Sequence, residues 1–248
     1  MNTAMNAVRF DHVSKAFGAH AILDDISFEV PAATAFCLLG RSGTGKSVTL
    51  RHIVGLVRPD SGRVFVQEQD ITNLSGRALA NVRKHMGFLF QGAALFDSMS
   101  VGDNVAFPMR RHTDWSNATI RERAQQKLAD VGLDKEFDKM PGDLSGGMRK
   151  RAGLARAMAL DPKILLVDEP SAGLDPITAS EIDELLVKTK AGGTTLVVVT
   201  HNIPSARVIG DRFAVLHDGR MLASGTLEAL EASQEPLVQA FMASQGGG

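Results

Sequence analysis

A glycine-rich stretch that ends in a lysine and a serine contains the residues best suited to chemistry. It fits the pattern G-x-x-x-x-G-K-[ST] and consists of Gly40, Arg41, Ser42, Gly43, Thr44, Gly45, Lys46 and Ser47. Small residues let backbone N–H groups surround phosphate oxygens, and a helix that follows directs the positive end of its dipole at the anion. We expect Lys46 to reach the β- and γ-phosphates of a nucleotide and Ser47 to bind Mg²⁺. A glycine-rich turn that binds no ligand is the alternative.

Two adjacent carboxylates supply the acidic groups that a nucleotide site of this kind requires. Asp168 and Glu169 follow the apolar run 164–167 and precede Pro170. Asp168 is suited to hold Mg²⁺, directly or through the water ligands of the ion. Glu169, one residue further, is suited to polarise a water that attacks the γ-phosphate. The alternative is a helix N-terminus that the acidic pair caps.

The segments around these residues have the pattern of an α/β fold. Continuous apolar runs predict strands that are covered on both faces, over 34–39, 87–91, 164–167 and 195–200. Helical spacing of apolar residues predicts helices over 46–56 and 177–190. The alternation of strand, helix and strand favours a parallel sheet as the core.

Further segments extend this core. Apolar and polar residues alternate on both sides of Gly18, which predicts an antiparallel β layer. Another strand is expected over 63–67. Asp218-Gly219 predicts a hairpin in which 213–217 pairs with 220–223. Residues 92–159 read mainly as helices, one of them amphipathic over 118–131. We expect one domain over 1–248, which consists of a core with its β layer (1–91 and 160–228), an inserted α-helical subdomain (92–159) and a C-terminal helical tail (229–248).

Composition and net charge indicate which classes of protein this chain resembles and which they argue against. The chain has 248 residues, 44% of them hydrophobic, which suffices for the core of one large domain, and its net charge of -1 gives no field that would gather nucleic acid. Cys37 is the only cysteine, so we expect a small buried hydrophobe and no disulfide or thiolate cluster. No apolar run reaches the roughly 20 residues of a membrane span. The start also lacks the pattern of a signal peptide, so we expect a soluble, unexported chain that contacts a membrane through a partner.

Nearly the whole chain resembles the ATPase subunits of ABC transporters. The segment 144–148, Leu-Ser-Gly-Gly-Met, is similar to the signature motif of that family, and further motifs follow the family order, at Gln91, 171–175 and His201. The resemblance implies a P-loop NTPase (RecA-like) core that binds ATP and Mg²⁺ and hydrolyses ATP. It also implies that Ser145, Gly146 and Gly147 of one subunit cover the ATP of the other, so that the active form is a homodimer.

The same resemblance implies roles for three further residues. His201 would contact the γ-phosphate, and Asp175 would link the two sites of the dimer. Gln91 would contact Mg²⁺ and the attacking water while it senses the state of the transporter. Arg149, Lys150 and Arg151, directly after the signature, could add positive field near the phosphates, and a solvated helical face is the alternative.

Two positions depart from the family pattern. The signature commonly ends in Gln, where this chain has Met148. Adenine usually stacks on an aromatic ring of the first strands, often Tyr, and this chain has no Tyr. Phe17 is our candidate for the stacking residue, because stacking requires only the face of a ring. A phenylalanine of the hydrophobic core is the alternative.

The segment that follows Gln91, over 91–108, is similar to that of ATPases in Mla/Mce lipid-transport systems, where a Met-ended signature also occurs. This similarity implies a membrane permease as partner and, through it, an MCE lipid-binding protein and accessory subunits. The cargo would be phospholipid or a related lipid of a bacterial envelope, and the ATPase would sit on the cytoplasmic side of the inner membrane. An importer of a polar solute such as an amino acid is the alternative. ABC ATPases that act on DNA or ribosomes carry long coiled coils or paired ATPase domains, which this sequence lacks.

Overall fold

The computed structural model describes residues 5–243, so residues 1–4 and 244–248, parts of the predicted start and tail, lie outside the described residues. The larger of two sheets has the strand order β10-β9-β3-β8-β7-β6. Its strands are parallel from β9 to β6, and β10 is antiparallel to β9. Its strands are β3 (Ala35–Leu39), β6 (Met86–Leu89), β7 (Ile164–Asp168), β8 (Thr195–Thr200), β9 (Arg212–His217) and β10 (Arg220–Gly225).

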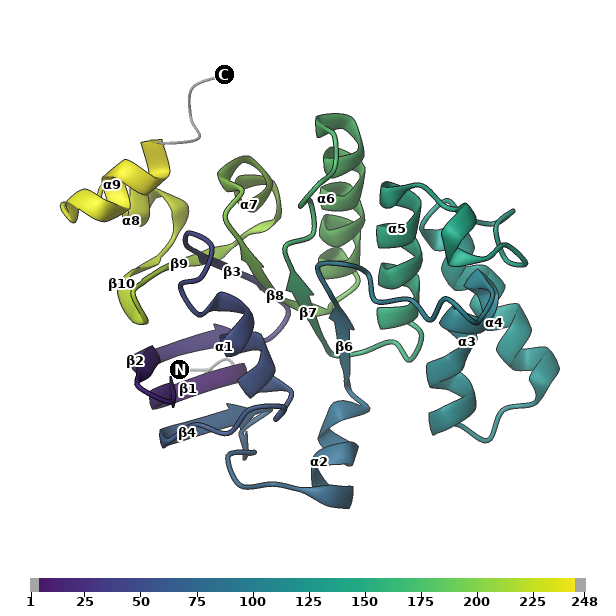
Figure 1. The fold of residues 1–248 in the computed structure, drawn as a ribbon, viewed down its shortest axis with the longest axis horizontal. Coiled ribbons are helices and arrows are strands. Elements are labelled where there is room, and N and C mark those ends of the chain that lie inside the picture. Colours follow the sequence, from purple (N-terminus) through teal and green to yellow (C-terminus); the bar gives the residue numbers. More distant parts are fainter. Residues whose placement is uncertain (1–4, 244–248) are drawn as a thin grey trace.

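The smaller sheet is antiparallel and has the order β2-β1-β4-β5. A tight turn at Gly18, whose φ is +61°, joins its two long strands, and Phe17 pairs with His20 across this turn. In Figure 1 this sheet lies beside the larger one, with α1 next to it. The strands are β1 (Asn6–Phe17), β2 (His20–Pro31), β4 (Ser61–Val66) and β5 (Gln69–Asp70).

The helices lie around the larger sheet (Figure 1). They are α1 (Lys46–Ile53), α2 (Gly76–Arg83), α3 (Val101–His112), α4 (Asn117–Asp130), α5 (Gly146–Ala157), α6 (Pro176–Ala191), α7 (Ile203–Ile209), α8 (Leu227–Glu231) and α9 (Pro236–Ala243), with a short 3-10 helix at Pro141–Asp143. The predicted fold class, a parallel core with an antiparallel β layer and a helical insertion, is therefore confirmed.

Two predicted elements end two or more residues earlier than expected. The helix expected over 46–56 stops at Ile53, because Gly55 takes a φ of +64° and the amide of Leu56 turns back to the carbonyl of Arg51. The strand expected over 87–91 runs over Met86–Leu89 instead, and its ladder with β7 ends where Leu89 pairs with Val167.

The central strands are buried on both faces, which explains their continuous apolar sequences. Every residue of β3 and of β8 is buried. Along β3, Cys37 and Leu39 pack into the core that α5 and α6 cover, while Phe36 and Leu38 pack into the core that α1 and the antiparallel sheet cover. Cys37 is a buried thiol, as expected, and its burial raises its pKa to about 12.

Helices α3, α4 and α5 pack on one another at the side of the sheet that ends in β6 (Figure 1). Serine side chains cap all three helices at their N-termini, through Ser100, Ser116 and Ser145. Trp115, in the connection between α3 and α4, is half-buried against this cluster, and the guanidinium of Arg123 lies 4.2 Å from the centre of its ring.

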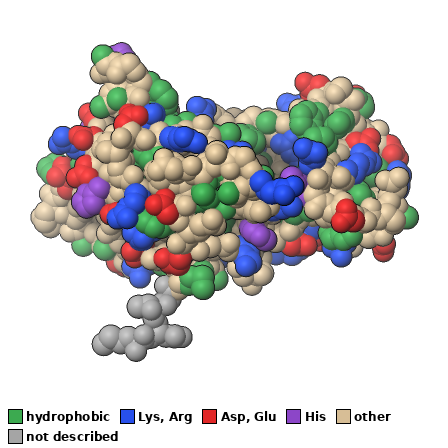
Figure 2. All heavy atoms as spheres, turned by 90° about the horizontal axis from the view of Figure 1, so that it is seen from below, with side chains coloured by type: hydrophobic (Ala, Val, Ile, Leu, Met, Phe, Trp, Pro, Cys, Tyr) green, Lys and Arg blue, Asp and Glu red, His purple; other side chains and the backbone are tan. Residues whose placement is uncertain are grey.

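The C-terminal segment forms two short helices that pack on the same chain. Val238 and Met242 are buried, whereas Leu237 is 47% exposed, so one face of α9 packs on the rest of the chain. None of the helices in residues 5–243 is long and apolar enough to cross a membrane. Figure 2 shows a face of the molecule on which Lys and Arg side chains are interspersed with Asp and Glu, so that no single sign of charge dominates it.

Candidate active site

The glycine-rich loop connects β3 to α1, at the carboxyl edge of the parallel sheet. Two of its glycines require positive φ, with values of +86° at Gly43 and +101° at Gly45. A Cβ on Gly45 would also lie 2.8 Å from the carbonyl oxygen of Ile22, so only glycine fits there. Gly45 directly precedes Lys46, the first residue of α1, so the loop ends at the N-terminus of that helix. Backbone amides at the N-terminus of a helix are suited to bind an anion such as phosphate.

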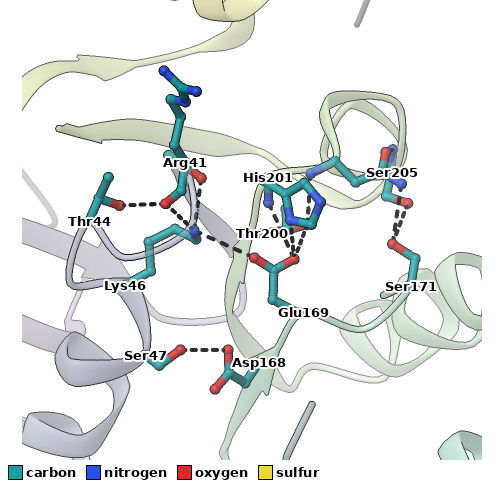
Figure 3. Close-up of polar contacts among 12 residues, drawn as sticks. Arg41, Thr44, Lys46, Ser47, Asp168, Glu169, Ser171, Thr200, His201 and Ser205 are labelled. Atoms are coloured by element: carbon teal, nitrogen blue, oxygen red, sulfur yellow. Dashed lines mark hydrogen bonds and ion pairs between the residues drawn. The ribbon is translucent and has the colours of Figure 1, made fainter. Parts of the chain in front are cut away.

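Lys46 lies at the centre of the loop and is 5% exposed. Its Nζ donates hydrogen bonds to the carbonyl oxygens of Gly40 (2.8 Å) and Arg41 (3.0 Å) and lies 3.5 Å from Oε1 of Glu169 (Figure 3). Burial lowers the pKa of Lys46, and the carboxylate of Glu169 opposes that shift. The loop thus holds an ammonium group close to where phosphate oxygens would bind.

Ser47 and Asp168 meet across the edge of the sheet. The Ser47 hydroxyl donates a hydrogen bond of 3.0 Å to Oδ1 of Asp168, the last residue of β7. Burial, followed by the charge of Glu169, raises the pKa of Asp168, and the hydrogen bond from Ser47 opposes this. A hydroxyl and a carboxylate oxygen at this separation match the oxygen donors that Mg²⁺ prefers, so these residues fit the predicted ion.

Glu169 occupies an unusual backbone conformation next to β7. Its φ is +47°, a value that residues with a Cβ rarely adopt. Its Oε2 lies 2.9 Å from Nδ1 of His201 and accepts hydrogen bonds from the Thr200 hydroxyl (3.2 Å) and the His201 amide (3.4 Å) (Figure 3). The side chain is therefore fixed between β8 and Lys46. The alternative of a helix capped by the acidic pair is wrong, since the next helix, α6, begins at Pro176.

Asp175 is the residue that caps α6. Its carboxylate accepts hydrogen bonds from the amides of Ile177 (3.1 Å) and Thr178 (3.0 Å) and from the Thr178 hydroxyl (2.6 Å). The hydrogen bonds from Thr178 lower its pKa. A local structural role at the helix N-terminus thus accounts for this side chain within one chain.

The signature segment lies apart from the loop of its own chain. Ser145 caps α5 and accepts a hydrogen bond from the amide of Met148 at 3.2 Å. Ser145 and Gly146 are exposed, whereas a Cβ on Gly147 would lie 2.3 Å from Cγ2 of Thr178 in α6. In Figure 1 the start of α5 is separated from α1 by β7 and α6. One chain therefore does not bring both halves of the predicted site together.

Met148 and the basic residues after it have separate environments. Met148 packs against the apolar cluster of the helices, which suits methionine better than the usual glutamine. A solvated helical face is wrong for Lys150, which is 5% exposed and donates a hydrogen bond of 2.8 Å to the carbonyl oxygen of Glu169. Arg149 is exposed and Arg151 half-buried, and they donate to carbonyl oxygens at Leu144 and Val131.

Two predicted residues lie at the margins of the site. Gln91 follows β6 by two residues and is exposed at the carboxyl edge of the sheet. Phe17, at the end of β1, is 49% exposed, so the alternative of a core phenylalanine is wrong. The Lys15 ammonium lies 5.4 Å from the centre of its ring.

A polar cluster behind the site escaped sequence reasoning. Ser171, just past Glu169, lies 3.3 Å from Nδ2 of Asn202 and 3.4 Å from Oγ of Ser205 (Figure 3). Ser205 also hydrogen-bonds the buried carboxylate of Asp183, whose pKa burial raises. The only sequence signal for this cluster is that Ser171 and Asn202 lie close to Glu169 and His201. Asp183 and Ser205 lie in ordinary helical patterns, which give no such signal.

Comparisons with known proteins place the chain in a family. Residues 23–172 match the family model described as ABC transporter. The intermembrane phospholipid transport system ATP-binding protein MlaF of Escherichia coli (strain K12) is 40% identical over 238 residues, which cover 96% of this chain and 88% of MlaF. The probable ribonucleotide transport ATP-binding protein mkl of Mycobacterium tuberculosis (strain ATCC 25618 / H37Rv) is 43% identical, and the match covers 95% of this chain. The chain spans only 66% of the length of that mycobacterial relative.

A solved structure shares the fold. It is a dimeric ATP-binding cassette in a post-hydrolysis state bound to ADP and Pi, with a TM-score of 0.82 and 32% identity, over 89% of this chain and 98% of the cassette. The predicted resemblance is thereby confirmed at the level of the family. With the phosphate loop, the acidic pair and the signature helix in this arrangement, the chain belongs to the ABC transporter family.

Proposed function

We propose that this chain is the ATP-hydrolysing subunit of an ABC transporter that moves phospholipids or related lipids across or between the membranes of a bacterial envelope. The observation that carries the hydrolytic part is the position of Glu169. Its carboxylate lies between His201 (2.9 Å) and Lys46 (3.5 Å), at the mouth of the phosphate loop. A carboxylate held in this way is suited to polarise an attacking water.

The remaining residues of the site would each have a separate role in phosphoryl transfer. Amides of the loop Gly40 to Ser47 would bind the phosphates, and Lys46 would neutralise charge on the β- and γ-phosphates. Ser47, Asp168 and Gln91 would hold Mg²⁺, which supplies further charge neutralisation when bound. His201 would contact the γ-phosphate. This assignment is supported by the oxygen donors and cations that converge at one edge of the sheet.

Adenine would stack on Phe17. Its exposed ring, on a strand hairpin whose Ile22 touches Gly45 of the loop, supports this assignment. We expect Phe17→Ala to weaken ATP binding about threefold to tenfold, and Phe17→Tyr to keep the wild-type affinity. Displacement of a fluorescent ATP analogue measures both affinities. Equal affinities for all three proteins would reject the stacking role.

Two copies of the chain would share each ATP. The exposed Ser145 and the N-terminus of α5 offer a hydroxyl and a positive dipole end, the groups that stabilise an anion, but they lie away from the loop of their own chain. A homodimer would place Ser145, Gly146 and Gly147 over the ATP of the partner, with Asp175 near the boundary of the two sites. The dimeric arrangement named for the related cassette structure supports this assembly.

A groove beside the helices is suited to the permease. It has a volume of about 340 Å³ and lies between β6 and α3. The exposed rings of Phe90, Phe96 and Phe107 line it, and Lys84 and Arg156 add positive charge. Through the permease the chain would sit on the cytoplasmic side of the inner membrane and reach an MCE lipid-binding protein and accessory subunits. We expect no nucleic-acid partner.

The name of MlaF, an intermembrane phospholipid transport ATPase, supports lipid as the cargo. The experiment that tests this is purification of the chain with its co-expressed membrane partners, followed by mass spectrometry of bound lipid. Lipid should be recovered with the complex, and added phospholipid should change the ATPase rate of reconstituted wild-type complex but not the residual rate of Glu169→Gln. Recovery with a periplasmic receptor for a polar solute, and no bound lipid, would instead favour an importer.

A further inference from the structure

Lys150 is a buried lysine that the proposed reaction does not use. It lies in the second turn of α5, five residues after Ser145, and its side chain is 5% exposed. Its Nζ donates a hydrogen bond of 2.8 Å to the main-chain carbonyl of Glu169. Thus the helix that begins with the signature Ser145 contacts the residue assigned to polarise the water.

The burial of this ammonium group is unfavourable by itself. Burial lowers the pKa of Lys150 to about 8, while the charges of Asp168 and Glu169 oppose that shift. An apolar side chain would pack at this position without the desolvation of a charge. Packing alone therefore does not explain a lysine here, whereas its hydrogen bond to the Glu169 carbonyl does.

A hydrogen bond to the Glu169 carbonyl stabilises a backbone conformation that is unfavourable by itself. The Glu169 φ of +47° is costly for a residue with a side chain. The amide of Glu169 donates to the carbonyl of Val199 at 2.9 Å, and its carbonyl accepts from the Ala172 amide (3.3 Å) as well as from Lys150. The shorter bond, from the charged donor, holds this peptide in place. The carboxylate of Glu169 extends from this same backbone to His201, where Oε2 lies 2.9 Å from Nδ1.

We propose that Lys150 is a positioning residue, which joins the signature helix α5 to Glu169 and so couples the seating of that helix to the alignment of the carboxylate. This inference rests on the proposed function, because it requires Glu169 to polarise the attacking water. In a dimer, α5 would contact the ATP of the partner through Ser145 and the active site of its own chain through Lys150. These positions are about 7.5 Å apart along the helix axis.

The test compares Lys150→Met, Lys150→Arg and the control Lys163→Met, which removes an exposed lysine of the neighbouring connection. We expect Lys150→Met to lower kcat at least about tenfold, while the Kd for ATP in Mg²⁺ stays within about twofold of wild type. Lys150→Arg keeps a charged donor and should recover kcat to within about threefold. Lys163→Met should have wild-type kcat and Kd.

A fourth variant separates the two proposals. In a Glu169→Gln background, Lys150→Met should lower the residual rate no further, because Lys150 acts through Glu169. A near-normal rate for Glu169→Gln alone would reject the proposed function. A large loss of kcat in Glu169→Gln together with a wild-type kcat in Lys150→Met would reject only the role of Lys150. The same holds if Lys150→Met loses ATP affinity as much as kcat, or if Lys150→Arg does not recover kcat. If the methionine variant does not fold, Lys150→Gln takes its place. It lacks the charged donor, so kcat should fall at least about threefold, and a wild-type kcat would reject the role of Lys150.

Discussion

The hydroxyl of Ser47 donates a hydrogen bond of 3.0 Å to the carboxylate of Asp168, although 121 positions separate the two residues in sequence. The first turn of α1 and the end of β7 are thereby joined at the carboxyl edge of the parallel sheet. The crossover connections of an α/β fold bring such distant strand ends to one edge. Two oxygen donors of the proposed Mg²⁺ site are thus already adjacent.

Ser47→Ala should therefore shift the Mg²⁺ dependence of ATP hydrolysis. Loss of one oxygen ligand should raise the Mg²⁺ concentration for half-maximal rate by about tenfold or more, and chelation with EDTA should abolish the wild-type rate. A Mg²⁺ titration of the ATPase rate measures both effects. Ser98→Ala, in the loop before α3, serves as a matched control. An unchanged Mg²⁺ dependence of Ser47→Ala would exclude this hydroxyl as a ligand.

Glu169→Gln should keep ATP binding but lower turnover by at least about a hundredfold, because the amide is a much poorer base for the attacking water. ATP should then accumulate between two chains and hold them together as a dimer in size-exclusion chromatography. The exposed Glu122→Gln on α4 is the control and should turn over normally. Near-normal hydrolysis by Glu169→Gln would contradict the assignment of Glu169.

Lys46→Ala should act at the binding step instead. The variant removes the buried ammonium at the centre of the loop, so we expect the affinity for ATP to fall by at least about tenfold. Equilibrium binding of ATP, measured by calorimetry, reports this change directly. An affinity equal to that of the wild type would refute the phosphate-binding role of the loop.

Much of this site could be predicted from sequence, because its parts are local. The continuous apolar runs of β3, β7 and β8 predict strands covered on both faces. The loop directly follows β3, and the acidic pair lies at the end of β7. Strand ends at one sheet edge then imply that Ser47, Asp168 and Glu169 lie close together. The end of α1 could also have been predicted, since Gly55 marks it.

Other contacts had no sequence signal. Lys150 donates to a main-chain carbonyl 19 positions away, and any residue type at that position offers the same carbonyl. The burial of Lys150 depends on how α5 is turned against β6 and the end of β7 near Glu169, and the helical spacing of the basic residues did not predict this orientation. Because this orientation could not be predicted, a solvated helical face for Arg149, Lys150 and Arg151 remained the alternative in the sequence analysis. Burial of charge in this protein is decided by tertiary packing.

Asp183 provides a test by pH. Burial raises its pKa above the ordinary value, and within residues 5–243 its Oδ1 has no hydrogen-bond partner. The folded state therefore binds the proton more tightly than the unfolded state, so stability falls as pH rises from the unfolded pKa through the folded one. Asp183→Asn should raise the Tm at pH 7, and the gain should vanish near pH 4, where the wild-type carboxyl is protonated.

The control for this prediction is Asp134→Asn, which changes an exposed aspartate in the connection after α4. Its Tm should follow that of the wild type at both pH values. Asparagine at position 183 still offers an oxygen to Ser205, so the change removes charge rather than an acceptor. A lower Tm of Asp183→Asn at pH 7 would show that the ionised carboxylate stabilises the fold.

Trp115 gives this protein an optical property that its family resemblance does not suggest. The chain has one tryptophan and no tyrosine. That tryptophan lies in the connection between α3 and α4, and the guanidinium of Arg123 in α4 lies over its ring. The intrinsic fluorescence of the chain therefore originates in the helical segment alone. A change in its emission on addition of ATP would report, without any label, that an event at the loop has reached helices α3 and α4, the first of which borders the groove that we propose for the permease.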